Sequence, residues 1–123
     1  MPVTHLNPII LFVANPQASA QFYSRILGIE PIEQSPTFVM FALPHGSMLA
    51  LWSKFTAEPF VTVGGGGCEI SFVESDVDAI YQEWLALGIP VAQVPTDMDF
   101  GRTFVALDPD GHRIRIYCPS KEA

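Results

Sequence analysis

The chain has 123 residues, 49% of them hydrophobic and 15% charged, so it is long enough to bury a core as one domain and too apolar to be disordered. Its formal net charge of −7, with only six Lys and Arg residues, excludes a basic surface for nucleic acid or an anionic membrane. The apolar runs are too short to span a bilayer, and no signal peptide is visible. We therefore expect a cytoplasmic protein without nucleic-acid or membrane partners.

The first half of the chain predicts a strand, a helix and three further strands. The apolar run 9–13 indicates the first strand. Asn15 and Pro16 then begin a helix, because Asn caps helices and Pro fits their first position. Gly28 ends this helix. Its apolar face comprises Phe22, Tyr23, Ile26 and Leu27. The further strands are predicted at residues 30–33, 37–43 and 48–52, with a turn at 44–47.

The second half repeats this order about 60 residues further along the chain. A strand at 69–73 precedes a helix that Ser75 or Asp76 caps and Gly88 ends. Its apolar face comprises Val77, Ile80, Tyr81, Trp84 and Leu85. The further strands are predicted at residues 90–94, 102–107 and 113–118, with an Asp-Pro-Asp-Gly turn at 108–111. Each half is thus a βαβββ module.

The two modules are joined by a linker that ends in four glycines, residues 64–67. No Lys-Ser/Thr pair follows these glycines, so they indicate a flexible hinge rather than a phosphate-binding loop. We assign module one to residues 1–53, the linker to 54–67 and module two to 68–123, within a single domain. Because a module of about 60 residues is marginal alone, the two should share a core or a dimer interface. The hinge leaves open whether modules pair within one chain or between two.

This arrangement resembles the glyoxalase, bleomycin-resistance and dioxygenase (vicinal-oxygen-chelate) superfamily over essentially the whole chain. The resemblance rests on residues 12–23, on Leu27-Gly28, on residues 75–79 and on the Asp-Pro-Asp-Gly turn with its following strand. It implies an α+β fold in which two βαβββ modules form a curved-sheet cup. For a chain of this size it also implies a homodimer.

The resemblance locates four positions at which metal-binding members donate His, Gln or Glu. They fall on Pro8, Ala50, Glu69 and Arg115. One possible donor in four is too few for a divalent metal, and a guanidinium cannot become a ligand. We therefore predict no metal and no cofactor, with an ion pair between Glu69 and Arg115 in the metal's place. That pair either only satisfies two buried charges or also contacts a polar edge of a ligand.

The histidines and cysteines do not change this prediction. His5, His45 and His112 lie before strands or in turns, where solvated side chains are expected. Cys68 and Cys118 match no zinc spacing or disulfide framework, and we predict two buried thiols.

Period-two alternation predicts which side chains face the cup. With Arg115 inward, the set in module two is Glu69, Ser71, Val73, Arg113 and Tyr117. The corresponding set in module one is Pro8, Ile10, Phe12, Ala50 and Trp52. Trp52 is equally suited to stacking on a ligand and to filling a core or interface. The loop 97–103 adds Phe100 and Arg102, as ligand contacts or as an ordinary bend. The predicted ligand-binding residues are Trp52, Glu69, Phe100, Arg102, Arg115 and Tyr117.

Within the superfamily, residues 49–53 and 100–104 most resemble the metal-free drug-binding branch of bleomycin- and phenazine-resistance type. This implies a protein that sequesters a small planar aromatic compound in an aromatic cup and has no catalytic residue. The alternative is a superfamily enzyme, lyase or dioxygenase-like, with an atypical metal set or with Glu69 as general base. A third hypothesis is a regulatory module whose cup is filled by side chains.

Overall fold

The computed structural model describes residues 1–62 and 64–120. They belong to two compact units, Met1–Val63 and Gly64–Ala123. Unit one contains β1 (Ile9–Val13), α1 (Pro16–Leu27), β2 (Glu33–Gln34), β3 (Phe38–Ala42), the 3-10 turn η1 (Pro44–Gly46) and β4 (Met48–Ser53). Unit two contains β5 (Glu69–Val73), α2 (Val77–Ala86), β6 (Val91–Met98), β7 (Gly101–Leu107) and β8 (Arg113–Pro119). Residue 63 of the predicted linker and residues 121–123 of module two lie outside the described residues.

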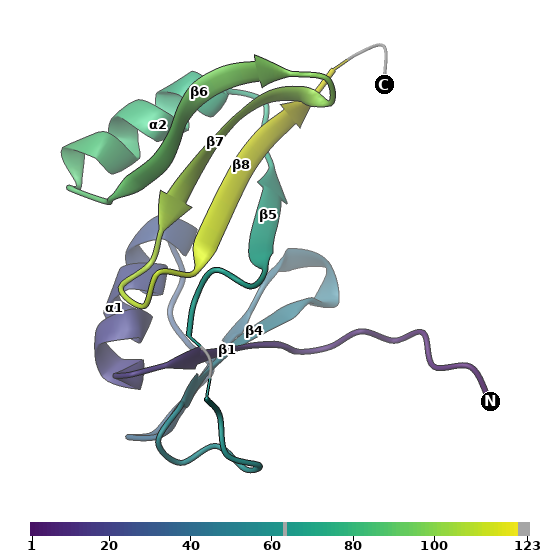
Figure 1. Cartoon of the computed structure of the whole chain (residues 1–123), viewed down its shortest axis with the longest axis vertical. Coiled ribbons are helices and arrows are strands. Elements are labelled where there is room, and N and C mark those ends of the chain that lie inside the picture. The colour runs from purple at the N-terminus through teal and green to yellow at the C-terminus, as the bar shows by residue number, and fades with distance from the viewer. Residues whose placement is uncertain (63, 121–123) are drawn as a thin grey trace. The chain divides into compact units, whose positions relative to one another are not determined.

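Both units have the same mixed four-stranded sheet. The strand orders are β1-β4-β3-β2 and β5-β8-β7-β6, and in each the first pair is parallel and the others are antiparallel. Figure 1 shows the sheet of unit two with α2 along one of its faces. These two βαβββ units confirm the predicted α+β fold.

Each helix covers one face of its own sheet. In unit one the covered face holds the buried side chains of Leu11, Val13, Val39, Phe41, Leu49 and Leu51. In unit two it holds Phe104, Ala106, Ile114 and Ile116. The ring of Phe104 packs edge-to-face with the rings of Tyr81 and Trp84 of α2, with centroids 5.5 and 5.4 Å apart. Burying such apolar faces is the main stabilising contribution within each unit.

The helix ends form as their capping residues predict. The side chain of Asn15 accepts hydrogen bonds from the backbone N–H groups of Gln17 and Ala18, both at 3.1 Å. Gly28 follows α1 in the left-handed conformation at φ 70°. Of the two cap candidates for α2, Asp76 is the cap, because its carboxylate accepts from the N–H of Ala79 at 3.0 Å.

Two strands differ from their predicted bounds at prolines. The second strand was predicted at 30–33, but β2 covers only Glu33–Gln34. Pro31 has no N–H to donate to a ladder, and Ile32 makes a single backbone bond to Met40 at 2.8 Å. Conversely, β6 continues past Pro95 to Met98, because register shifts between Gln93 and Thr96 accommodate the proline.

Four residues differ from their predicted burial. Leu85, predicted on the apolar face of α2, is 47% exposed in its last turn. Cys68 is exposed because it precedes β5, and Cys118 is half-buried because it lies beyond the part of β8 that pairs with β5. His112 was predicted to be solvated but is buried next to the start of β8, where its backbone N–H donates to the Asp108 carboxylate at 2.8 Å. Neither helix of the described chain has the length and apolar character needed to cross a membrane.

Candidate functional site

The face of unit two opposite α2 carries the charged residues singled out from the sequence. We call it the open face of unit two; it comprises Glu69, Ser71 and Val73 of β5, Arg113, Arg115 and Tyr117 of β8, Thr103 and Val105 of β7, and Gln93 of β6. The strand register brings these side chains to one side of the sheet, because Ser71 lies opposite Arg115 and Thr103 opposite Tyr117. The predicted face of module two is thus confirmed.

Glu69 forms the predicted ion pair with Arg115. The Arg115 Nε–H donates to Glu69 Oε1 at 2.6 Å, and a second guanidinium, that of Arg113, donates from Nε to Glu69 Oε2 at 2.9 Å. Arg115 Nη1 also donates to Gln93 Oε1 at 3.2 Å and to Thr103 Oγ1 at 3.1 Å. The pair is therefore the centre of a network that spans all four strands of the sheet.

The network keeps Glu69 ionised. The hydrogen bond from Arg115 lowers the pKa of the Glu69 carboxyl below its ordinary value of 4.5, against the opposing effect of partial burial. The charges of Arg115 and Arg113 lower this pKa further. A general base works best with a pKa near the working pH, so a carboxylate held by two guanidinium groups is poorly suited to remove a proton.

Two aromatic rings lie beside this network. Phe100, in the turn between β6 and β7, packs edge-on against Tyr117 with ring centroids 5.9 Å apart. The guanidinium carbon of Arg115 is 5.7 Å from the centroid of the Phe100 ring, within the range of a cation–π contact. Phe100 remains 38% exposed. The structure thus brings together four of the predicted site residues: Glu69, Phe100, Arg115 and Tyr117.

Trp52 lies on the corresponding face of unit one. The register pairs Trp52 with Phe12 on one side and Phe38 on the other. The ring centroids of these neighbours are 6.0 and 6.4 Å from that of Trp52. Ala50 and Ile10 share this face, as predicted. We call this side of the sheet, opposite α1, the open face of unit one. It is apolar, whereas the open face of unit two carries charged side chains.

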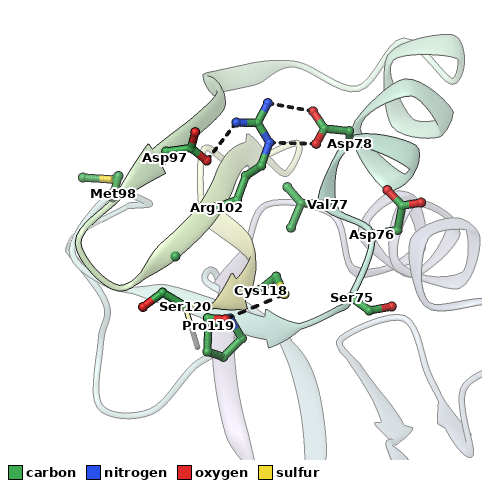
Figure 2. A pocket seen from close by; sticks show the side chains of 11 residues that line it. Ser75, Asp76, Val77, Asp78, Asp97, Met98, Arg102, Cys118, Pro119 and Ser120 are labelled. Carbon is green, nitrogen blue, oxygen red and sulfur yellow. Dashed lines mark hydrogen bonds and ion pairs between the residues drawn. The ribbon is translucent and has the colours of Figure 1, made fainter. Parts of the chain in front are cut away.

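Arg102 is not on either open face. It lies one residue from Thr103 and so points to the α2 side of its sheet, between two carboxylates (Figure 2). Its guanidinium donates to Asp78 at 2.7 and 2.9 Å and to Asp97 at 3.0 Å. The hydrogen bond to Asp78 is the main cause that raises the pKa of Arg102, and the same bond lowers the pKa of Asp78.

The surroundings of Arg102 form a separate hollow of about 480 Å³ at the start of α2. Asp76, Asp78 and Asp97 line it together with Arg102. Two of these three carboxylates already form ion pairs with the one guanidinium. The hollow therefore offers no surplus positive charge to an acidic ligand. Arg102 therefore fastens α2 to the β6–β7 hairpin and is separated from the other predicted ligand contacts.

The four positions expected to hold metal donors do not fit a metal ion. The registers support their alignment, because Ile10 pairs with Ala50 in unit one just as Ser71 pairs with Arg115 in unit two. Pro8, Ala50 and Arg115 offer no donor atom, and both Glu69 oxygens are engaged by guanidinium groups. Among the described residues, no three His, Cys, Asp or Glu side chains gather closely enough to hold a metal.

The sequence did not reveal the roles of Arg113, Gln93 and Thr103. Alternation placed Arg113 on the correct face, but it gives no hydrogen-bond partners. Gln93 is two residues before Pro95, where the strand pattern was expected to end, and only the register shifts bring it opposite Val105.

Comparison with known proteins identifies the family to which this chain belongs. A family profile described as the Glyoxalase/Bleomycin resistance protein/Dioxygenase superfamily matches residues 5–116. The chain therefore belongs to this superfamily.

Individual relatives cover nearly the whole chain. The phenazine antibiotic resistance protein EhpR of Enterobacter agglomerans is 34% identical over 124 residues, which cover 96% of this chain and 94% of EhpR. The solution NMR structure of protein ATC0852 from Agrobacterium tumefaciens is 46% identical with a TM-score of 0.83, covering 96% of this chain and 99% of that one. TnmS3, an antibiotic binding protein from Streptomyces sp. CB03234, shares the fold at 23% identity and a TM-score of 0.75, covering 98% and 99% of the two chains.

Proposed function

We propose that this protein binds a planar aromatic compound without a metal and sequesters it chemically unchanged. The observation that carries the proposal is the Glu69–Arg115 ion pair, which lies at strand positions where metal donors are expected in the superfamily. A protein that has replaced three of four donors with Pro8, Ala50 and Arg115 keeps a fold suited to binding but lacks the coordination chemistry.

Aromatic rings that are only partly buried support an aromatic ligand. Phe100 and Tyr117 flank the ion pair, and Trp52 lies between Phe12 and Phe38 on the open face of unit one. Flat rings of this kind offer large apolar contact areas and stack or pack edge-on with another ring, each such pair contributing about 0.5–1.5 kcal/mol beyond area burial. The similarity to EhpR, whose name states resistance to a phenazine antibiotic, supports the same class of ligand.

The enzyme hypothesis has less support from the site. Among the residues that the structure describes, Glu69 is the only acidic side chain within the network, and its lowered pKa makes it a weak base. The homodimer that the resemblance implies stays a prediction.

Calorimetric titration with phenazine-1-carboxylic acid, followed by mass spectrometry of the recovered compound, tests the proposal. We expect saturable binding, an unaltered compound and less than about 0.1 equivalent of divalent metal per chain, because one metal per chain is the minimum for a resident site. Replacing Phe100 with Ala should weaken binding about three- to tenfold, the factor that corresponds to one lost aromatic pair. Phe60→Ala, which removes a ring that is 80% exposed in the segment after β4, should leave the affinity unchanged.

The role of Trp52 has its own readout. The chain has two tryptophans, and Trp84 is buried against Phe104. In a Trp84→Phe variant the emission comes from Trp52 alone, and we expect the ligand to quench it. Conversion of the compound to a product, or one tightly bound divalent ion per chain, would contradict the proposed function.

A further inference from the structure

We propose that the ligand of the open face of unit two is an aromatic carboxylate, and that Arg113 is the residue that selects for its negative charge. This inference rests on the proposed function and goes beyond it, because it assigns the ligand's charge and a recognition residue. Three observations carry it: the charge balance of the face, the unequal engagement of its two arginines, and the distance from Arg113 to the aromatic rings.

The charge balance of the open face is positive. The strands of unit two carry three charged side chains there, Glu69, Arg113 and Arg115, so one carboxylate opposes two guanidinium groups and the sum is +1. The other charged strand residues, Asp97 and Arg102, are paired with each other on the α2 side. A surplus positive charge on a chain of net charge −7 is a local feature that favours an anionic ligand.

The two arginines of the face are engaged to different degrees. Arg115 is 15% exposed and donates to Glu69, Gln93 and Thr103, so it is fixed in the network. Arg113 is 43% exposed and donates only from Nε, to Glu69. Among the described residues, no acceptor lies within hydrogen-bond distance of either Nη group of Arg113. These two groups are available for the paired oxygens of a carboxylate, the geometry for which a guanidinium is best suited.

Arg113 and the aromatic rings are within reach of one small molecule. Arg113 and Tyr117 lie on the same side of β8, four residues apart, which corresponds to about 13 Å along a strand. Phe100 packs against Tyr117 and against Arg115, which lies between the two ends. A compound whose ring system packs on Phe100 and Tyr117 can therefore direct a carboxylate towards Arg113.

Glu69 restricts where on the open face of unit two an acidic group of the ligand can bind. Its carboxylate is bound to Arg115 and to the Nε of Arg113, so it repels an acidic group that approaches the middle of the face. The Nη groups of Arg113, from which Glu69 accepts no hydrogen bond, are the donors to which an acidic group can bind. A neutral analogue loses the charged hydrogen bonds but keeps its ring contacts, and hydrogen bonds to charged groups are the stronger kind.

A matched ligand pair tests the inference. Phenazine-1-carboxylic acid and its primary amide have the same rings and differ in charge, and calorimetry at pH 7.5 gives both affinities for the full chain. We expect the acid to bind at least about tenfold more tightly than the amide. In Arg113→Gln this preference should fall to within about twofold, while the affinity for the amide changes little. Arg113→Lys, which keeps the charge and loses the two-pronged geometry, should retain part of the preference.

Arg25→Gln provides the control. Arg25 lies exposed in the last turn of α1, and its replacement changes the net charge by the same amount as Arg113→Gln. We expect it to keep the full preference for the acid, and melting temperatures of all variants to show that they are folded. Equal binding of acid and amide by the unmodified protein, or an unchanged preference in Arg113→Gln, would overturn the inference and leave the proposed function standing. Failure of both compounds to bind would overturn both.

Discussion

Replacing Arg115 with Met should destabilise the protein by about 2 kcal/mol. The substitution keeps an unbranched apolar side chain and removes every donor of the guanidinium. Surface ion pairs contribute about 0–1 kcal/mol, and breaking a fully buried pair costs about 3–5 kcal/mol. The side chains of Arg115 and Glu69 are 15% and 28% exposed, which is between these limits. Arg113 still neutralises Glu69 in the variant, so the cost stays below that of an isolated buried charge.

A double-mutant cycle measures the interaction itself. Urea unfolding of Arg115→Met, Glu69→Gln and the double variant at pH 7 gives the coupling free energy, which we expect to be at least about 1 kcal/mol because the two side chains are in direct contact. A coupling below about 0.5 kcal/mol, the level at which independent sites add, would refute the claim that this pair stabilises the sheet. Titration of the same variants with the aromatic acid shows whether the pair also contributes to binding.

Two further predictions concern acid stability and backbone packing. Because its neighbours lower the pKa of Glu69 in the folded state, the unfolded chain binds more protons near the ordinary value of 4.5. This contribution is present above about pH 5 and is lost as the pH falls, so urea unfolding of Glu69→Gln should depend less on pH between about 5 and 3; parallel curves would contradict this. Gly101→Ala should lower the free energy of unfolding by at least about 3 kcal/mol, because the added Cβ would overlap the Cys118 carbonyl and Gly101 has a φ of 141°. Gly111→Ala should lower it by about 1–2 kcal/mol, because Gly111 has a φ of 82° but its added Cβ would meet no other atom. Thermal unfolding measures both losses, and equal losses would be evidence against the overlap.

The fold was predictable because its signals are local and occur twice. Asn15-Pro16 and Asp76 mark the helix starts, and short apolar runs bounded by turn residues mark most of the strands. The largest errors in strand bounds occur at prolines: β2 is shorter than predicted beside Pro31, and β6 continues through Pro95 by register shifts that no local pattern reveals. The residue at which a strand ends depends on its pairing with a neighbouring strand, and local sequence patterns do not contain that information.

The site was predictable in part because both units share one register. The superfamily resemblance placed Glu69 and Arg115 together, and the shared register supports the alignment of the two modules on which the four donor positions depend. The assignment of Arg102 as a ligand contact ignored the β7–β8 hairpin, whose turn puts Leu107 opposite Arg113 and therefore Thr103, not Arg102, on the face of Tyr117. That signal was present in the sequence as the Asp-Pro-Asp-Gly turn.

The ionic network also fixes the charge of the open face across physiological pH. A guanidinium stays protonated in proteins, and the pKa of Glu69 is shifted away from neutrality by its arginine partners. Metal sites behave differently, because their ligands must lose protons and the ion must be supplied. With Arg113 and Arg115 against one carboxylate, the face keeps its surplus positive charge whatever the metal supply. Because the charge of this network stays constant, we expect any pH dependence of binding near neutral pH to follow the ionisation of the ligand's own acid group.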